Sequence, residues 1–101
     1  TVMNTLSLHD ALPISDHAAG RDAALGDQMR RAMQSVVLNT AEGMGSRGRN
    51  RQVRYHSALG SMRETLACIH VGIALGYIDE PNANLTDRID RVAATLFRLV
   101  S

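Results

Sequence analysis

Residues 55–73 read YHSALGSMRETLACIHVGI, and the apolar side chains in this stretch recur at alternating steps of four and three residues. The positions that carry the pattern are Tyr55, Leu59, Met62, Leu66, Ile69 and Ile73. Such steps keep side chains on one face of an α-helix, and they are typical of helices that pack against other helices. The stretch therefore predicts a long amphipathic helix, which we place at residues 50–75.

The same spacing occurs on both sides of this segment. It is carried by Leu25, Met29, Ala32, Val36 and Asn39 before the segment, and by Leu85, Ile89, Val92, Leu96 and Leu99 after it. We expect helices at about residues 22–42 and 84–100, joined to the central helix by loops at 43–49 and 76–83. Three amphipathic helices with short connections predict an all-α fold, an antiparallel up-down bundle.

Residues that favour helix ends stand near the predicted boundaries. The candidate N-caps are Asp22, Asn50, and Asn82 or Asn84, because short polar side chains accept hydrogen bonds from the first helical N–H groups. Gly43, Gly45 and Gly76 are expected to end helices, because glycine adopts the left-handed cap conformation at little cost. Tyr77 and Ile78 could supply the apolar contact that accompanies such a cap.

Length and composition exclude several classes of protein. The chain has 101 residues, enough for one domain, and only 3% of them are aromatic, which disfavours a strand-rich fold. One cysteine, Cys68, can form neither an internal disulfide nor a structural zinc site. No run approaches 18 apolar residues, so we expect no membrane partner and a cytoplasmic protein. No pattern indicates a cofactor.

The charge is concentrated in the middle of the chain. All eleven basic residues are arginines, and the net charge of the whole chain is only +1. Residues 30–63 contain seven arginines against Glu42 alone, a net charge of +6, while the flanking parts are acidic. Anionic partners respond to local potential, so this segment is the candidate contact region.

The first residues stand apart from the bundle pattern. Residues 5–14, TLSLHDALPI, resemble the translation of one reading frame of a short-read sequencing adapter, and Asn4 and Ser15 fit its flanks. We interpret residues 1–15 as an assembly artefact and residues 16–101 as the helical domain. The alternative is a genuine amphipathic helix that Pro13 ends.

Three motifs carry a family resemblance. They are RRAMQSVVLNTAEG at residues 30–43, ALGSMRE at residues 58–64 and LGYI at residues 75–78. In this order and spacing they resemble the family of four-helix bundles encoded in intervening sequences of 23S ribosomal RNA genes. That family is similar to the accessory variability determinant of diversity-generating retroelements.

The resemblance implies a bacterial four-helix bundle in which this chain supplies the second, third and fourth helices, with the first helix missing or replaced. It also implies a protein that is not an enzyme and that forms a homo-oligomer, a pentamer in the retroelement protein. The implied partners are RNA or DNA and a reverse transcriptase.

An arginine cluster is the strongest candidate for a binding site. Arg47, Arg49, Arg51 and Arg54 surround a glycine-rich turn and a predicted helix start, where exposed N–H groups and guanidinium groups can hold phosphate oxygens. Arg30 and Arg31 on the preceding helix could extend the surface. Base stacking is poorly provided for, because the nearby aromatic residue, Tyr55, belongs to the core. The alternatives are a solvated loop and a surface for an acidic protein.

Four polar residues match the family motifs at other positions. Asn39 and Glu42 lie on one predicted helix, and Ser61 and Glu64 lie on the next. An unpaired amide at the Asn39 position would be costly, so we expect a structural polar network rather than an acid–base pair.

Histidines do not indicate a metal site. His56, Arg63 and His70 recur every seven residues and form a predicted surface stripe, but the two histidines are about 21 Å apart on a helix. Cys68 points away from His70, so we expect it to be an apolar packing residue.

Overall fold

The computed structural model describes residues 8–79 and 83–101, and this part of the chain contains four helices and no strand. The helices are α2 (Leu8–Ala19), α3 (Ala23–Met44), α4 (Gly48–Ala74) and α5 (Ala83–Val100). The all-α prediction is confirmed, and the ends of the three helices expected from the apolar spacing lie within two residues of their predicted positions.

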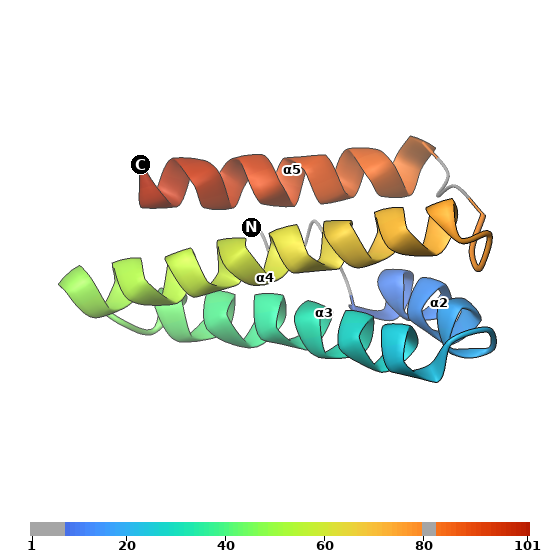
Figure 1. Ribbon diagram of the computed structural model, residues 1–101. Helices are drawn as coiled ribbons and strands as arrows, with labels where there is room; N and C mark the ends of the chain where they lie inside the picture. Colours follow the sequence, from blue (N-terminus) through green and yellow to red (C-terminus); the bar gives the residue numbers. More distant parts are fainter. Residues whose placement is uncertain (1–7, 80–82) are drawn as a thin grey trace.

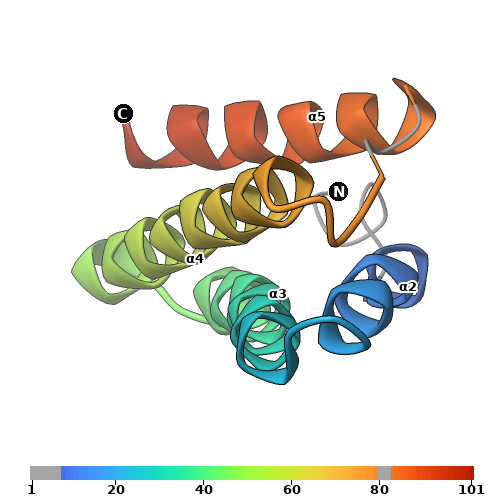
Figure 2. The ribbon, with the colours of Figure 1, turned by 45° about the vertical axis from the view of Figure 1, so that its right-hand side comes forward.

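The central helix, α4, organises the bundle. It runs the length of a molecule that measures 42 × 25 × 21 Å, with α3 along one side and α5 along the other (Figure 1). The shorter α2 packs beside the first part of α3 (Figure 2). Since α3 and α4 are joined by a short turn, they form an antiparallel hairpin, and the contact between them is the most extensive in the fold.

The core follows the predicted apolar positions. Met29, Met62, Val92 and Leu96 have no exposed surface, so all three long helices contribute fully buried side chains. Side chains at the ends of the pattern, such as Leu85, are only partly buried, and Leu99 is 39% exposed. Asn39 is half-buried, and the buried line on α3 continues instead through Thr40, whose hydroxyl donates to the Val36 carbonyl at 2.6 Å.

Two of the predicted helix ends are confirmed. The carboxylate of Asp22 accepts a hydrogen bond from the Leu25 N–H at 3.0 Å and caps α3. After α4, Gly76 has a φ of 73°, and the N–H groups of Tyr77 and Ile78 donate to the Gly72 carbonyl. Ile78 is buried against Gly72, so the expected apolar contact is present.

The predicted N-cap of α4 was wrong. The helix begins at Gly48 rather than after Asn50, and its N-cap, Arg47, makes no side-chain capping hydrogen bond. Asn50 lies inside the first turn, where its amide donates to the Ser46 hydroxyl at 3.1 Å. For α5, Asn82 lies outside the described residues, and Asn84 lies within the helix rather than before it.

Gly43 does not end α3, which continues to Met44. Gly45 is the C-cap, and its φ of −88° is right-handed, so neither glycine acts through a left-handed conformation. Gly43 instead permits close packing between the two helices of the hairpin. A Cβ atom at this position would lie 2.5 Å from Cε1 of Tyr55, a distance that no side chain could occupy without displacing the ring.

A short helix occupies the place of the first bundle helix. Ser15 and Ala18 of α2 have no exposed surface, and Gly26 of α3 packs tightly against Ala19. Pro13 lies inside α2 and does not end it. The boundary that we proposed at residue 15 therefore falls within a helix, while the adapter-like origin of residues 4–15 stays a prediction.

Candidate nucleic-acid interface

The hairpin tip, which we define as residues 45–54, is the turn between α3 and α4 together with the first two turns of α4. Three residues, 45–47, join the two helices. Gly48 then has a φ of 59°, the left-handed conformation that glycine adopts most easily, and it allows the chain to enter α4 abruptly. The first N–H groups of α4 donate no hydrogen bond to the side chain of its N-cap, Arg47.

Three arginines of the tip have no carboxylate partner among the described residues. We call Arg47, Arg49 and Arg54 the tip arginines. Arg47 and Arg49 are exposed and Arg54 is half-buried. Unpaired guanidinium groups beside uncapped N–H groups make this end of the hairpin attractive to phosphate oxygens.

Arg51, the fourth arginine of the predicted cluster, has a different environment. Its Nε donates to the Ser46 carbonyl at 2.8 Å and to the Gly43 carbonyl at 3.1 Å, and one terminal nitrogen reaches the Met44 carbonyl at 3.5 Å. Its guanidinium group is therefore directed at the protein backbone. The sequence placed Arg51 in the same cluster as its neighbours and gave no sign of this difference.

Arg30 and Arg31 are not brought to the tip. Arg30 pairs with Asp16 at 2.9 Å, and Arg31 pairs with Asp27 at 3.1 Å. Thirteen residues of α3 separate Arg31 from the end of that helix, about 20 Å at the helical rise. These two arginines lie on a different part of the surface and are neutralised locally.

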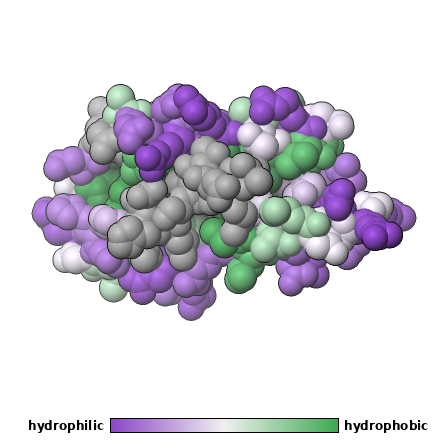
Figure 3. Space-filling model, turned by 180° about the vertical axis from the view of Figure 1, so that it is seen from behind, coloured by the Kyte–Doolittle hydropathy of each residue, from purple (hydrophilic) through white to green (hydrophobic). Residues whose placement is uncertain are grey.

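The molecule has a basic end and an acidic end. Gln52 at the tip donates to the Leu99 carbonyl at 3.2 Å, so the end of α5 lies beside the tip. Residues 37–62 and 93–101 contain five arginines against one acid, Glu42, a net charge of +4, whereas the remaining described residues contain eight acids and six arginines, a net charge of −2. In Figure 3 the tip projects at the right-hand end as hydrophilic surface.

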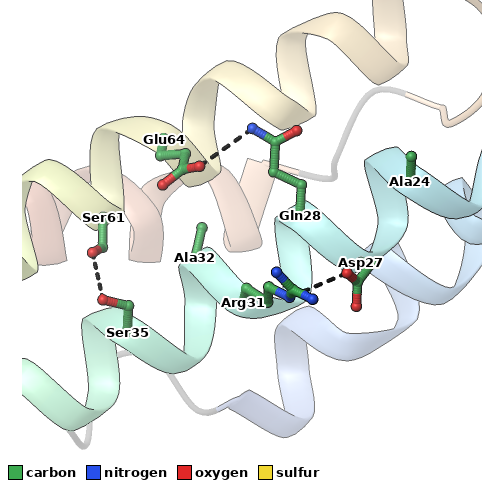
Figure 4. Close-up of a pocket in the computed structure, with 8 residues that line it drawn as sticks. All are labelled: Ala24, Asp27, Gln28, Arg31, Ala32, Ser35, Ser61 and Glu64. Atoms are coloured by element: carbon green, nitrogen blue, oxygen red, sulfur yellow. Dashed lines mark hydrogen bonds and ion pairs between the residues drawn. The ribbon is translucent and has the colours of Figure 1, made fainter.

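The predicted polar network is present in part. The hydroxyl groups of Ser35 and Ser61 lie 2.7 Å apart between α3 and α4 (Figure 4). The Asn39 amide donates to the Ser35 hydroxyl and carbonyl at 3.0 Å. Asn39 and Ser61 are therefore connected through Ser35, which the sequence argument did not assign to the network. The serine at position 35 was visible in the first family motif, and its place on the same helix face as Asn39 was the available signal.

Glu64 and Glu42 lie far apart along the hairpin. Glu64 accepts a hydrogen bond from Gln28 at 3.2 Å, at the edge of a groove of about 540 Å³ that also contains the Asp27–Arg31 pair (Figure 4). Glu42 is exposed near the tip, and its backbone carbonyl accepts a hydrogen bond from Ser46 at 2.6 Å. The structure does not bring the two carboxylates together.

The other candidate positions lie where the sequence placed them. His56, Arg63 and His70 are exposed on α4. Cys68 is buried, and burial together with the charge of Glu64 raises the pKa of its thiol, which disfavours the reactive thiolate. Within residues 8–79 and 83–101, no three metal-binding side chains converge, and no helix has the length and hydropathy to cross a membrane.

Comparison with known families gives one match. The model of the 23S rRNA-intervening sequence protein family matches residues 12–98, which span all of α3 and α4 and nearly all of α5. The chain belongs to this family. The match also begins within α2, three residues before the boundary at residue 15, and the family's description names no enzymatic activity. No curated protein and no solved structure matches the chain.

Membership in the 23S rRNA-intervening sequence protein family accounts for the helical architecture. A fold does not determine a function, so what the protein binds has to be argued from its surface. The surface features on which that argument rests are the hairpin tip and a set of exposed apolar side chains, Val53, Val71, Leu75 and Phe97.

Proposed function

We propose that this family member is a non-enzymatic accessory protein that binds the sugar–phosphate backbone of RNA or DNA through its hairpin tip. The observation that supports this function is the set of tip arginines, which have no carboxylate partner in residues 8–79 and 83–101, next to the uncapped N-terminus of α4. By contrast, Arg30 and Arg31 on α3 each pair with an acid, and Arg91 on α5 pairs with Asp87 at 3.0 Å.

The chemistry of the tip favours backbone contacts over base recognition. Guanidinium groups form paired hydrogen bonds with phosphate oxygens, and these contacts carry no sequence information. Tyr55, the aromatic residue nearest the tip in sequence, is 7% exposed and packs in the core, so it offers no stacking surface. Binding should therefore be similar for unrelated sequences and should depend steeply on salt.

The test is a salt titration of binding. The full chain is mixed with fluorescent single-stranded RNA and duplex DNA of arbitrary sequence, and affinity is measured from about 50 to 200 mM salt. We expect log affinity to fall linearly with log salt, with a slope of about 2–3 for three phosphate contacts. No binding at the lowest salt concentration would contradict the proposal.

A specific observation also favours a second function, an oligomeric scaffold. Val53, Val71, Leu75 and Phe97 are each about half exposed. Val53 and Val71 lie on α4, and Leu75 is its C-cap. Apolar side chains at these positions gain from contact with another protein surface, such as a second copy of the chain. Light scattering tests the scaffold function, which predicts a particle mass greater than that of one chain. The protein partners, including the reverse transcriptase implied by the resemblance, stay predictions.

A further inference from the structure

The hairpin tip brings together two helix ends of opposite polarity. The carbonyl groups that end α3 carry partial negative charge, and the N–H groups that begin α4 carry partial positive charge, each equivalent to about half an elementary charge. Only three residues separate the two ends. If both sets of groups were equally exposed, their fields would largely cancel, and the tip would attract anions only through its arginine side chains.

Arg51 removes this balance. It donates to the carbonyls of Gly43, Met44 and Ser46, which are the last residues of α3 and the middle of the turn. A full positive charge thus lies on the negative end of α3, where cations are stabilising. The Ser46 hydroxyl covers a further carbonyl, that of Glu42, at 2.6 Å. The N–H groups of α4 are not covered in the same way.

We propose that Arg51 is a positioning residue that makes the tip selective for anions without itself contacting the phosphate backbone. It fixes the turn that carries Arg47 and it neutralises the carbonyls of α3, so the positive end of α4 and the tip arginines dominate the field. This inference rests on the proposed function. It divides the four clustered arginines into three that contact the ligand and one that holds the turn.

The experiment compares two single variants, Arg51→Met and Arg49→Met. Each removes one positive charge and keeps a long side chain in the first turn of α4. Affinity for the same RNA and DNA probes is measured against salt, well below the unfolding temperature. We expect Arg49→Met to reduce the salt slope by about 0.7–0.9, because one phosphate contact is lost. Arg51→Met should leave the slope unchanged and weaken binding about two- to fivefold, the size expected for a charge at a helix end.

A conservative variant provides the rescue. Lysine at this position keeps the charge and three N–H donors, so Arg51→Lys should recover most of the lost affinity. Hydrogen exchange gives an independent readout: Arg51→Met should accelerate exchange of the amides at residues 45–48, and Arg49→Met should not.

Two outcomes would overturn the role of Arg51. The first is that Arg51→Met reduces the salt slope of binding as much as Arg49→Met does. The second is that the Arg51→Met variant binds the probes with the same affinity as the unmodified protein. Both leave the proposed function standing, because the unmodified protein still binds. If the unmodified protein binds neither probe, the proposed function itself fails.

Discussion

The stem and the tip of the α3–α4 hairpin are built from similar residues and differ in how their polar groups are partnered. In the stem, Ser35 bonds Ser61, Gln28 bonds Glu64, and Arg31 pairs with Asp27. At the tip, Arg47 and Arg49 have no carboxylate partner among the described residues, and α4 begins without a capping side chain. These polar groups of the stem are thus partnered within the protein, whereas the groups named at the tip are available to a ligand.

The largest expected effect on polyanion binding comes from removing the tip arginines. Replacing Arg47, Arg49 and Arg54 together with Gln should flatten the salt slope of polyanion binding by about 2–3 and reduce affinity by one to two orders of magnitude at low salt. Fluorescence anisotropy measures this. The matched control is the replacement of Arg30, Arg31 and Arg91 with Gln, which removes the same charge from paired positions. Equal losses in both triple variants would mean that binding is diffuse and that the tip is not its site.

Two glycine substitutions contrast the close contact between the helices with the exposed face of α4. Gly43→Ala should destabilise the protein by about 1–3 kcal/mol, because the new Cβ would displace the Tyr55 ring. Gly60→Ala should stabilise it by about 0.5–1 kcal/mol, because no atom lies within 4 Å of the new Cβ and alanine favours the helix. Denaturant unfolding measures both changes, and the same sign for both variants would contradict the packing described here.

A smaller effect is expected in the polar network of the stem. Ser35→Ala removes the 2.7 Å contact with Ser61 and should cost about 1 kcal/mol of unfolding free energy. Ser57→Ala is the control, because Ser57 is exposed and makes no hydrogen bond through its side chain to the described residues. Thermal unfolding of the two variants should differ. Identical midpoints would show that the network contributes nothing to stability.

The smallest effect is expected for an ion pair of the stem. Arg30→Gln breaks the 2.9 Å pair with Asp16, but both side chains are substantially exposed, at 42% and 64%. Surface pairs of this kind contribute less than about 1 kcal/mol, so stability should change little and polyanion affinity should remain within about twofold. A loss comparable to that of a tip arginine would place Arg30 in the binding surface after all.

The helices were predictable because apolar spacing is a local property that the core preserves. Leu25, Met29 and Val36 repeat at steps that only a helix can place on one face, and all three are buried. The helix ends were harder, because they depend on partners from other segments. Glycine is a residue type that often ends helices, and Gly43 was predicted to do so for that reason. Its role depends instead on contact with Tyr55, twelve residues later, and the sequence does not show that these two residues are in contact.

The candidate site was predictable in its location and not in its internal division. The arginines around a glycine-rich turn are visible in the sequence, and they were enough to predict where the cluster lies. Which arginine faces the backbone depends on the angle at which α4 leaves the turn, and that angle follows from the positive φ of Gly48. Likewise, the pairing of Arg30 with Asp16 required knowing that α2 folds back onto α3.

The separation of charge between the two ends has a kinetic consequence. A molecule with a net charge of +1 experiences little overall attraction to a polyanion, but opposite charges at the ends of a 42 Å body form an electric dipole. The electric field of a polyanion exerts a torque on this dipole, and the torque turns the basic end of the protein toward the polyanion before contact. The torque acts over roughly the Debye length, about 8–10 Å at physiological salt, and raises the fraction of collisions that arrive in the correct orientation.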